Sequence, residues 1–227
     1  MVDWQKYEGY REVTAYPSDF SENRFGIDLL WKATEKAEIL YRGWPFIFVD
    51  RNRKETYVIS DSIETVVDLT RVRGHEYFEM WKLRRSGLFF HRALMDEETY
   101  PRAVEQGKVL GLELTVYHIS EAIGSLWHLY GELGVPSDEP LTINFAYKGV
   151  KDRNLVVLSP SRAGFMGVQI CRSPQISFER CFPLGEWRAS EEDIAIEISA
   201  EVFRQFQWIE PNITSIRELA SELLAKR

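Results

Sequence analysis

The chain has 227 residues, 44% of them hydrophobic, with seven tryptophans, thirteen phenylalanines and a formal charge of −7 at pH 7. This apolar content excludes a disordered protein, and the acidic balance argues against nucleic-acid binding over the whole surface. The N-terminus lacks the apolar core of a signal peptide. The longest apolar run, near Trp44, is far shorter than the ~20 residues that span a bilayer. We therefore expect a soluble, cytoplasmic protein.

The first 41 residues divide into two parts. Residues 1–20 are rich in Tyr, Glu and Arg and contain Pro17 and Asp19 as breakers, so we expect an irregular N-terminal arm that packs on the body or contacts a partner. From about residue 21 to residue 41, apolar side chains recur at three- and four-residue steps, which predicts an amphipathic helix. Gly43 follows as a reasonable stop for this helix.

The remainder reads as short extended runs interrupted by helices. Runs rich in β-branched and aromatic residues predict strands at 44–49, 57–59, 63–69, 109–113, 141–147, 154–158, near 165–171 and at 176–182. We expect the 154–158 strand to pair antiparallel with 141–147 after a turn around Gly149. Helices are expected from the 109–113 run to about Leu133, from a Ser190 cap to about Phe206, and after a Ser215–Glu218 capping box.

These elements predict an α+β fold, with a mixed, mainly antiparallel sheet covered by about four helices. Residues 96–108 are expected to be a polar loop or a short helix, and they are the best candidate for a domain boundary. No Gly/Ser/Pro linker divides the chain there or elsewhere. We therefore expect a single α+β domain over residues 21–227, preceded by the arm over 1–20.

The stretch from His75 to Leu94 combines aromatic residues with concentrated positive charge. It predicts two strands joined at Ser86-Gly87, where glycine permits a positive φ or a bulge. Between residues 71 and 92 there are six arginines and lysines but only two glutamates. Basic and aromatic residues interleaved on a strand suit phosphate and base contacts. The alternative is that these side chains coat the solvent face of a sheet and protect its edge.

A polar group on the expected helix before Leu133 is the nearest approach to a catalytic constellation. His118, Glu121, Ser125 and His128 fall on one face, and a His–Glu pair one turn apart can act as a general base or supply two metal ligands. The motif lacks the HExxH pattern and a third ligand, so a solvated polar helix face is the alternative. We assign no catalytic residue and expect no metal site or cofactor, since Cys171 and Cys181 form no CxxC pair.

Arg42-Gly43-Trp44-Pro45 places a large aromatic residue beside a rigid one. One interpretation is a corner between helix and strand with Trp44 as a core plug. The other is a lipped groove for a ligand or a partner peptide. No GxSxG, GxxxxGK[ST] or GxGxxG motif occurs in a suitable context.

Two groups of residues also resemble a known bacterial pattern. These are Arg42-Gly43-Trp44-Pro45-Phe46 and the run from Trp81 to His91, supported by shorter matches at 119–121, 152–155 and 203–208. The pattern resembles the function-unassigned C-terminal module found behind AlbA/Schlafen-like putative DNA-binding domains. The DNA-binding domain itself has no counterpart in residues 1–20. The resemblance therefore implies an accessory or sensing module in a regulatory or defence assembly, and it transfers no catalytic residue.

Three hypotheses follow. The first is a non-enzymatic module that binds a partner protein or small ligand, since Trp, Tyr and Arg are enriched at interfaces. Its expected binding residues are Arg42, Trp44, Arg84, Arg85, Ser86 and His91. The second is nucleic-acid binding through the 71–92 cluster. The third is a hydrolase-type enzyme that uses His118 and Glu121, with His91 or Ser86 brought near by folding. The sequence leaves the oligomeric state open.

Overall fold

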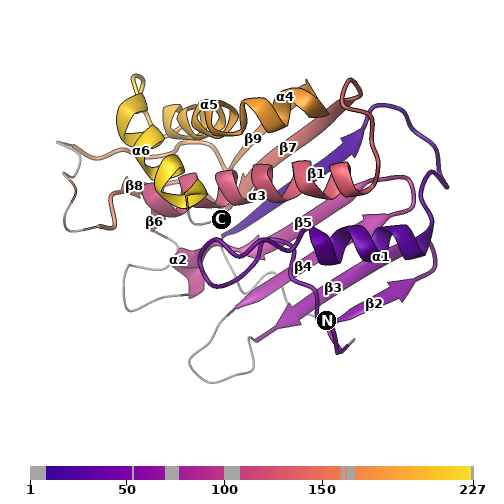
Figure 1. Cartoon of the computed structure of the whole chain (residues 1–227). Helices are drawn as coiled ribbons and strands as arrows, with labels where there is room; N and C mark the ends of the chain where they lie inside the picture. Colours follow the sequence, from indigo (N-terminus) through magenta and orange to yellow (C-terminus); the bar gives the residue numbers. More distant parts are fainter. Residues whose placement is uncertain are drawn as a thin grey trace.

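The fold is built on one large antiparallel sheet. The computed structural model describes residues 9–52, 54–69, 77–99, 108–159, 162 and 167–225. Within them, seven strands pair in the order β2-β3-β4-β5-β1-β7-β9 (Figure 1). Their bounds are β1 Tyr10–Pro17, β2 Thr56–Ile59, β3 Ser62–Asp68, β4 Phe78–Arg84, β5 Phe89–Leu94, β7 Pro140–Lys148 and β9 Gln175–Pro183. The expected α+β class with a mainly antiparallel sheet is therefore confirmed.

Strand β1 lies inside this sheet, between β5 and β7. The expectation of an irregular arm over residues 1–20 is wrong for Tyr10–Pro17, while residues 1–8 lie outside the described part. Alternation in β1 explains the pairing, because Arg11, Val13 and Ala15 are buried on one face. The polar residues between them hid this pattern, so the segment did not look like a central strand.

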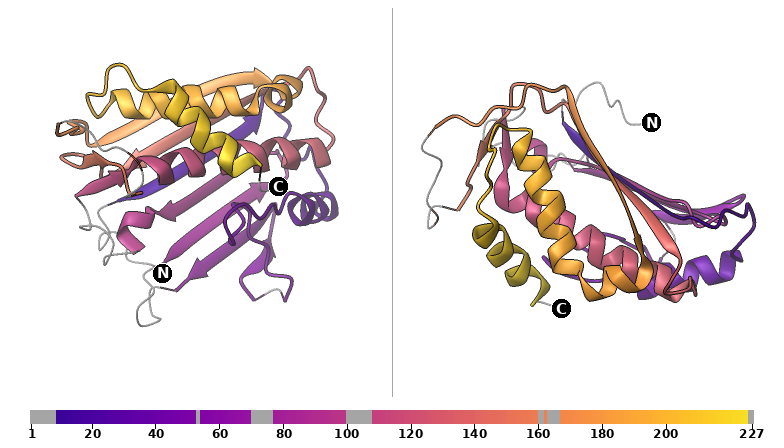
Figure 2. Two further views of the ribbon diagram at one scale, coloured as in Figure 1. Left: turned by 60° about the vertical axis from the view of Figure 1, so that its left-hand side comes forward. Right: turned by 90° about the horizontal axis from the view of Figure 1, so that it is seen from above.

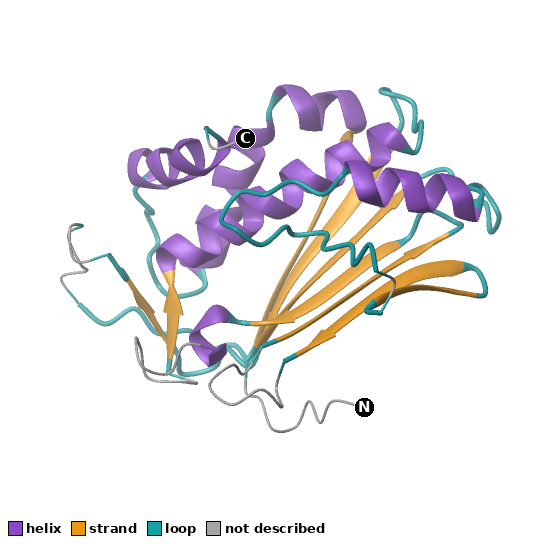
Figure 3. Cartoon of the chain, turned by 60° about the horizontal axis from the view of Figure 1, so that its bottom comes forward, coloured by secondary structure: helices purple, strands orange, loops and turns teal. Residues whose placement is uncertain are grey.

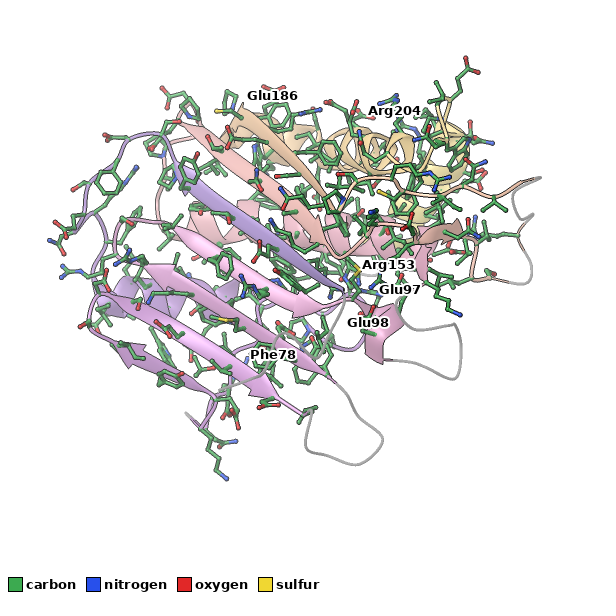
Figure 4. All side chains as sticks on the ribbon, turned by 180° about the vertical axis from the view of Figure 1, so that it is seen from behind. Phe78, Glu97, Glu98, Arg153, Glu186 and Arg204 are labelled. Atoms are coloured by element: carbon green, nitrogen blue, oxygen red, sulfur yellow. The ribbon has the colours of Figure 1, made fainter. Side chains whose placement is uncertain are left out.

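The helices pack on one face of the sheet, as the view from above shows (Figure 2). Within the described residues they are α1 Ile27–Lys36, α2 Asp96–Thr99, α3 Leu112–Glu132, α4 Leu184–Ala189, α5 Glu191–Arg204 and α6 Ile213–Leu224. Seen from behind, none of the described helices lies in front of the sheet (Figure 4). Helix α3 runs along the middle of the covered face, and its mostly buried side chains join the main core.

Two expected caps differ in detail. Ser190 occupies the N-cap position of α5, but its side chain makes no capping hydrogen bond. At α6 the cap is Asn212, whose side chain accepts from the Ser215 backbone N–H, so the expected capping box centred on Ser215 is wrong. Asparagine is as good an N-cap as serine because its side-chain oxygen reaches the same N–H group.

A second, two-stranded sheet lies beside the large one. Strand β6, Val109–Gly111, pairs with β8, Asn154–Val156, in parallel. The expected antiparallel pairing of 154–158 with 141–147 is therefore wrong, and β9 occupies that place beside β7. Strand β6 leads directly into α3, so this small sheet fixes where the long helix begins. The expected strand near 165–171 is wrong over its described part, residues 167–171, which contain only an isolated bridge between Ile170 and Asn154.

The segment from Trp44 to Val49 is a loop rather than the expected strand. Its apolar residues are used for packing instead of sheet pairing, since Phe46, Ile47 and Val49 are buried in the core. The loop crosses the helix-bearing side of the sheet (Figures 1 and 3). Among the described residues, no helix is long and apolar enough to cross a membrane.

Candidate functional site

Five of the six expected binding residues lie at two opposite ends of β4, and the sixth, Arg42, contacts Glu121 of α3 instead. Trp44 and His91 both contact Glu79 near the start of this strand. Arg84 ends the same strand, and Arg85 and Ser86 follow in the turn. At about 3.3 Å per residue, the five steps from Glu79 to Arg84 span roughly 17 Å. The six residues therefore do not converge on one small surface.

The basic side chains on the strands are paired with carboxylates. The pairs are Arg84 with Asp61, Lys82 with Glu64, and Arg92 with Glu12. Each pair joins neighbouring strands or their turn, so the charge that looked concentrated in the sequence is locally balanced. Arg71, Arg73 and His75 lie outside the described residues.

The turn after β4 uses its polar groups locally. Arg85 donates from Nε to the backbone oxygen of Phe25 at 3.0 Å, and the Ser86 hydroxyl accepts from the Leu88 backbone N–H at 3.4 Å. Gly87 has a φ of +88°, which is the first of the two alternatives that the sequence left open for this position. The serine therefore belongs to the turn rather than to a site near His118.

The expected polar face of α3 faces the protein interior and joins a cluster of five charged or titratable side chains. We call this set the Asp96 cluster: Arg11 of β1, Arg42 of the loop after α1, Asp96 of α2, and His118 and Glu121 of α3. Arg42 holds Glu121 with two hydrogen bonds of 2.7 and 2.8 Å. Asp96 accepts from Arg11 at 3.4 Å and lies 3.7 Å from Arg42. The alternative of a solvated helix face is therefore wrong for His118 and Glu121.

His118 uses both of its ring nitrogens inside this cluster. Its Nδ1 lies 3.2 Å from Nη2 of Arg42, and its Nε2 lies 3.1 Å from Oδ2 of Asp96. Because a guanidinium can only donate, Nδ1 accepts and Nε2 carries the proton that is donated to Asp96. This arrangement gives both ring nitrogens a partner and occupies the lone pair that a general base would use.

The cations keep the buried carboxylates ionised. Burial alone would raise the pKa of Asp96, but the hydrogen bond from His118 and the charges of Arg11 and Arg42 hold it well below its usual range. Burial opposes ionisation of Glu121 as well, yet its hydrogen bonds with Arg42 lower its pKa. Arg42 in turn has a raised pKa, because the bonds to Glu121 outweigh burial. These charges satisfy one another inside the fold.

A second group of polar side chains surrounds Glu79, which we call the Glu79 group: Trp44, Tyr77, Glu79 and His91. The Trp44 indole N–H donates to Glu79 at 2.9 Å, and the Tyr77 hydroxyl donates to the same carboxylate oxygen. His91 lies 3.2 Å from the other oxygen and packs against Phe46, with ring centroids 4.4 Å apart. Burial lowers the pKa of His91 and, with Glu79, raises that of Tyr77.

Both groups fasten the same loop, residues 38–50, which we call the strap. Arg42 ties it to α3, and Trp44 ties it to β4. The Trp81 indole also donates to the Phe48 backbone oxygen at 2.8 Å. Trp44 stacks on Phe48 with ring centroids 4.5 Å apart, yet 40% of it stays exposed. The strap therefore holds a partly exposed tryptophan in a fixed orientation.

The three acids of α2 all point into the protein. Asp96 joins the cluster above, while Glu97 accepts from the Gly111 backbone N–H and Glu98 pairs with Arg153. Arg153 is fully buried and also donates to the Gly149 and Val109 backbone oxygens. Figure 4 shows Glu97, Glu98 and Arg153 close together beside the end of the sheet. The expectation of a polar loop or a short helix over residues 96–108 did not include this burial of the acids.

The described cavity beside the Asp96 cluster is too small for a metabolite, and the larger described groove lies elsewhere. A cavity of about 10 Å³ adjoins Arg11, His118 and Tyr147, which is space for about one water molecule. A groove of about 470 Å³ lies elsewhere, between α1 and β2. Among the described residues, no group of three or more His, Cys, Asp or Glu side chains is arranged to hold a metal ion.

No family model, curated protein or solved structure matches this chain. The resemblance to the module behind AlbA/Schlafen-like domains therefore stays a prediction. The fold and the geometry of the two polar groups are the basis for the function proposed below.

Proposed function

We propose that this chain is a non-enzymatic accessory module that binds a partner protein through the strap. The observation that carries the proposal is the way Trp44 is held. Its ring is fixed by a hydrogen bond to Glu79 and by stacking on Phe48, while 40% of it remains exposed. A preorganised, partly exposed tryptophan loses little conformational freedom on binding and is typical of interface hot spots.

A second side chain of the strap supports this assignment. Leu40 is 58% exposed, whereas Phe46, Ile47 and Val49 of the same loop are buried. The strap thus divides its apolar residues between the core and the surface. Exposed single apolar residues are common in proteins, but Leu40 and Trp44 flank an arginine anchored by buried carboxylates. Leu40 and Trp44 therefore form a small apolar contact surface on a loop that the anchored arginine holds in place.

The two competing functions have less support. Catalysis by His118 would need a ring nitrogen free for proton transfer, and both nitrogens have partners within 3.2 Å. Nucleic-acid binding would need unpaired cations, and Lys82, Arg84 and Arg92 each face a carboxylate. Absence of any retardation of DNA or RNA at low salt would remove the second of these functions.

The proposal is tested by affinity capture from the source cells, comparing the wild type with Trp44→Ala. We expect the variant to bind the captured partner about 30-fold more weakly, the loss typical of a hot-spot residue. Phe20→Ser is the matched control, because Phe20 is 76% exposed but lies outside the strap. Equal retention by wild type and Trp44→Ala, or no retained partner at all, would contradict the proposal.

A further inference from the structure

Glu79 is a buried carboxylate with which no lysine or arginine of the described residues forms an ion pair. It is 2% exposed, and its hydrogen-bond partners are Trp44, Tyr77 and His91. Trp44 and Tyr77 both donate to Oε2, which suits a carboxylate better than an acid that carries its own hydrogen. Burial lowers the pKa of His91, so its ring is neutral near neutral pH. None of the three partners therefore supplies a positive charge.

Buried acids elsewhere in the described part of the chain lie beside a positive group. Glu121 pairs with Arg42. Glu97 accepts from the N-cap residue of α3, and Glu113 lies in the first turn of that helix, where the helix dipole favours negative charge. Glu79 lies on a strand, which has no comparable dipole. A buried charge without a counterion is costly, so a cation from outside the chain is the partner that Glu79 lacks.

The Trp44 ring is the route by which such a cation can approach Glu79. Its indole N–H contacts Oε2 of Glu79 at 2.9 Å, while 40% of the residue is exposed to solvent. Phe48 stacks on this ring, and Tyr77 meets it edge-on, with ring centroids 6.0 Å apart. Trp44 therefore connects an exposed aromatic surface to a buried negative charge.

The cations of the chain itself lie over other aromatic rings. Arg42 lies over Tyr117 at 5.4 Å, and Arg188 lies over Trp127 at 5.6 Å. Within the described ranges, no cation lies over Trp44. The exposed part of this ring is thus available to a cation of another molecule.

We propose that the partner of the strap contributes an arginine side chain, which stacks on Trp44 above Glu79. This inference rests on the proposed function, since it names the group that Trp44 recognises. A guanidinium is planar and stacks well on aromatic rings. The ring and the carboxylate attract it together, and the formal charge of −7 favours a basic partner segment.

Titration of the isotope-labelled chain with N-acetylarginine N-methylamide, followed through the tryptophan indole N–H signals, tests the site. The Trp44 signal is assigned by its loss in Trp44→Phe. We expect it to shift with a dissociation constant on the order of 10 mM, the weak affinity of a single stacked cation. The citrulline analogue has nearly the same shape without the charge and should give no saturable shift. A Trp44 signal that ignores the arginine probe, or responds equally to citrulline, would overturn the proposal.

The variant Glu79→Gln tests the source of the attraction. Glutamine keeps the shape and an acceptor oxygen for the Trp44 N–H but removes the charge, so the arginine probe should bind about fivefold more weakly. Asp61→Asn is the matched control, because it removes a carboxylate beside Arg84 at the other end of β4. It should bind the probe like the wild type. Equal affinities of the two variants would overturn the proposal.

A measurement on the wild type covers the case in which Glu79→Gln disturbs the strap. Nuclear Overhauser effects between the δ-methylene protons of the arginine probe and the aromatic rings locate the bound guanidinium. We expect effects to Trp44 and Tyr77 but none to Trp127, whose ring already has Arg188 over it. Effects to Trp127 without Trp44, or equal effects to both, would overturn the proposal.

Partner capture separates this inference from the proposed function. If Trp44→Ala loses the captured partner and Glu79→Gln retains it at wild-type strength, the strap binds a partner but the arginine is wrong. Weaker capture by both variants supports both proposals. If no partner is captured at all, the proposed function is contradicted, while the probe titration still shows whether Trp44 and Glu79 bind a guanidinium.

Discussion

At the scale of single residues, the main feature of this protein is the number of titratable side chains that it buries. Asp96 and Glu121 remain ionised because cations lie beside them. His91 differs from them, since it is only 2% exposed and its Nδ1 has no hydrogen-bond partner among the described residues. An imidazolium needs two accepted N–H bonds, so this environment favours the neutral ring.

His91 should therefore make folding stability depend on pH. Unfolded histidine titrates near pH 6.5, whereas burial lowers the pKa of His91 in the folded protein. Below about pH 6.5 the unfolded state binds the extra proton, so stability is full above that pH and falls as the pH is lowered, by at most about 1.4 kcal/mol per unit. Urea denaturation between pH 5.5 and 7.5 measures this slope.

The matched comparison uses two glutamine variants. His91→Gln should flatten the slope between pH 5.5 and 7.5, while His128→Gln should leave it unchanged, because His128 lies at a half-exposed position on α3. A slope that persists in His91→Gln would show that another group causes it. Asp96 and Glu121 titrate at lower pH, so their contributions fall outside this window.

At the scale of elements, the local sequence pattern predicted where the strands lie better than it predicted which strands pair with each other. The strands at 57–59, 63–69, 141–147 and 176–182 and the two around Ser86-Gly87 are all present. Pairing depends on distant segments, so neither the central position of β1 nor the parallel contact of β8 could be read locally. The prediction of a strand at 44–49 was wrong because an apolar loop that packs into the core has the same composition as a strand.

The candidate site shows the same limit. The sequence analysis named Arg42, Trp44 and His91 as expected binding residues because of their residue types. The structure places all three in the two polar groups. Arg11 and Glu79 were missed. Alternation within each strand could have found them, since Glu79 shares a face with Trp81 and Leu83. Their partners could not be predicted, because contacts such as Arg42 with Glu121 join residues 79 positions apart.

Alanine substitutions at two glycines, one in a turn and one in a helix, should change the free energy of unfolding in opposite directions. Gly87 has a φ of +88°, and a Cβ there would lie 2.9 Å from Phe25 and 3.0 Å from Pro17. Gly87→Ala should therefore lower the free energy of unfolding by about 2 kcal/mol. Gly131 is helical with open space around it, so Gly131→Ala should raise it by up to about 1 kcal/mol. Thermal or urea unfolding of both variants measures these changes, and equal effects of the two would contradict the account.

At the scale of the whole molecule, the helices cover one face of the sheet, and the buried charges join that cover to the interior strands β1, β4 and β5. The Asp96 cluster joins β1, α2, α3 and the strap, and the Glu79 group joins β4, β5 and the strap. Segments far apart in the sequence therefore meet through hydrogen-bonded charges. Such groups are costly to break, because removing one partner leaves the others buried and unpaired.

The central claim is that these buried charges hold the strap in place. Amide hydrogen exchange of Arg42→Met, measured by mass spectrometry, tests it most directly. Exchange in residues 38–50 should be about tenfold or more faster than in the wild type, since opening of the strap would no longer break the ion pairs. Helix α5, remote from Arg42, should exchange at the wild-type rate. An unchanged rate in the strap, or a uniform increase over the whole chain, would contradict it.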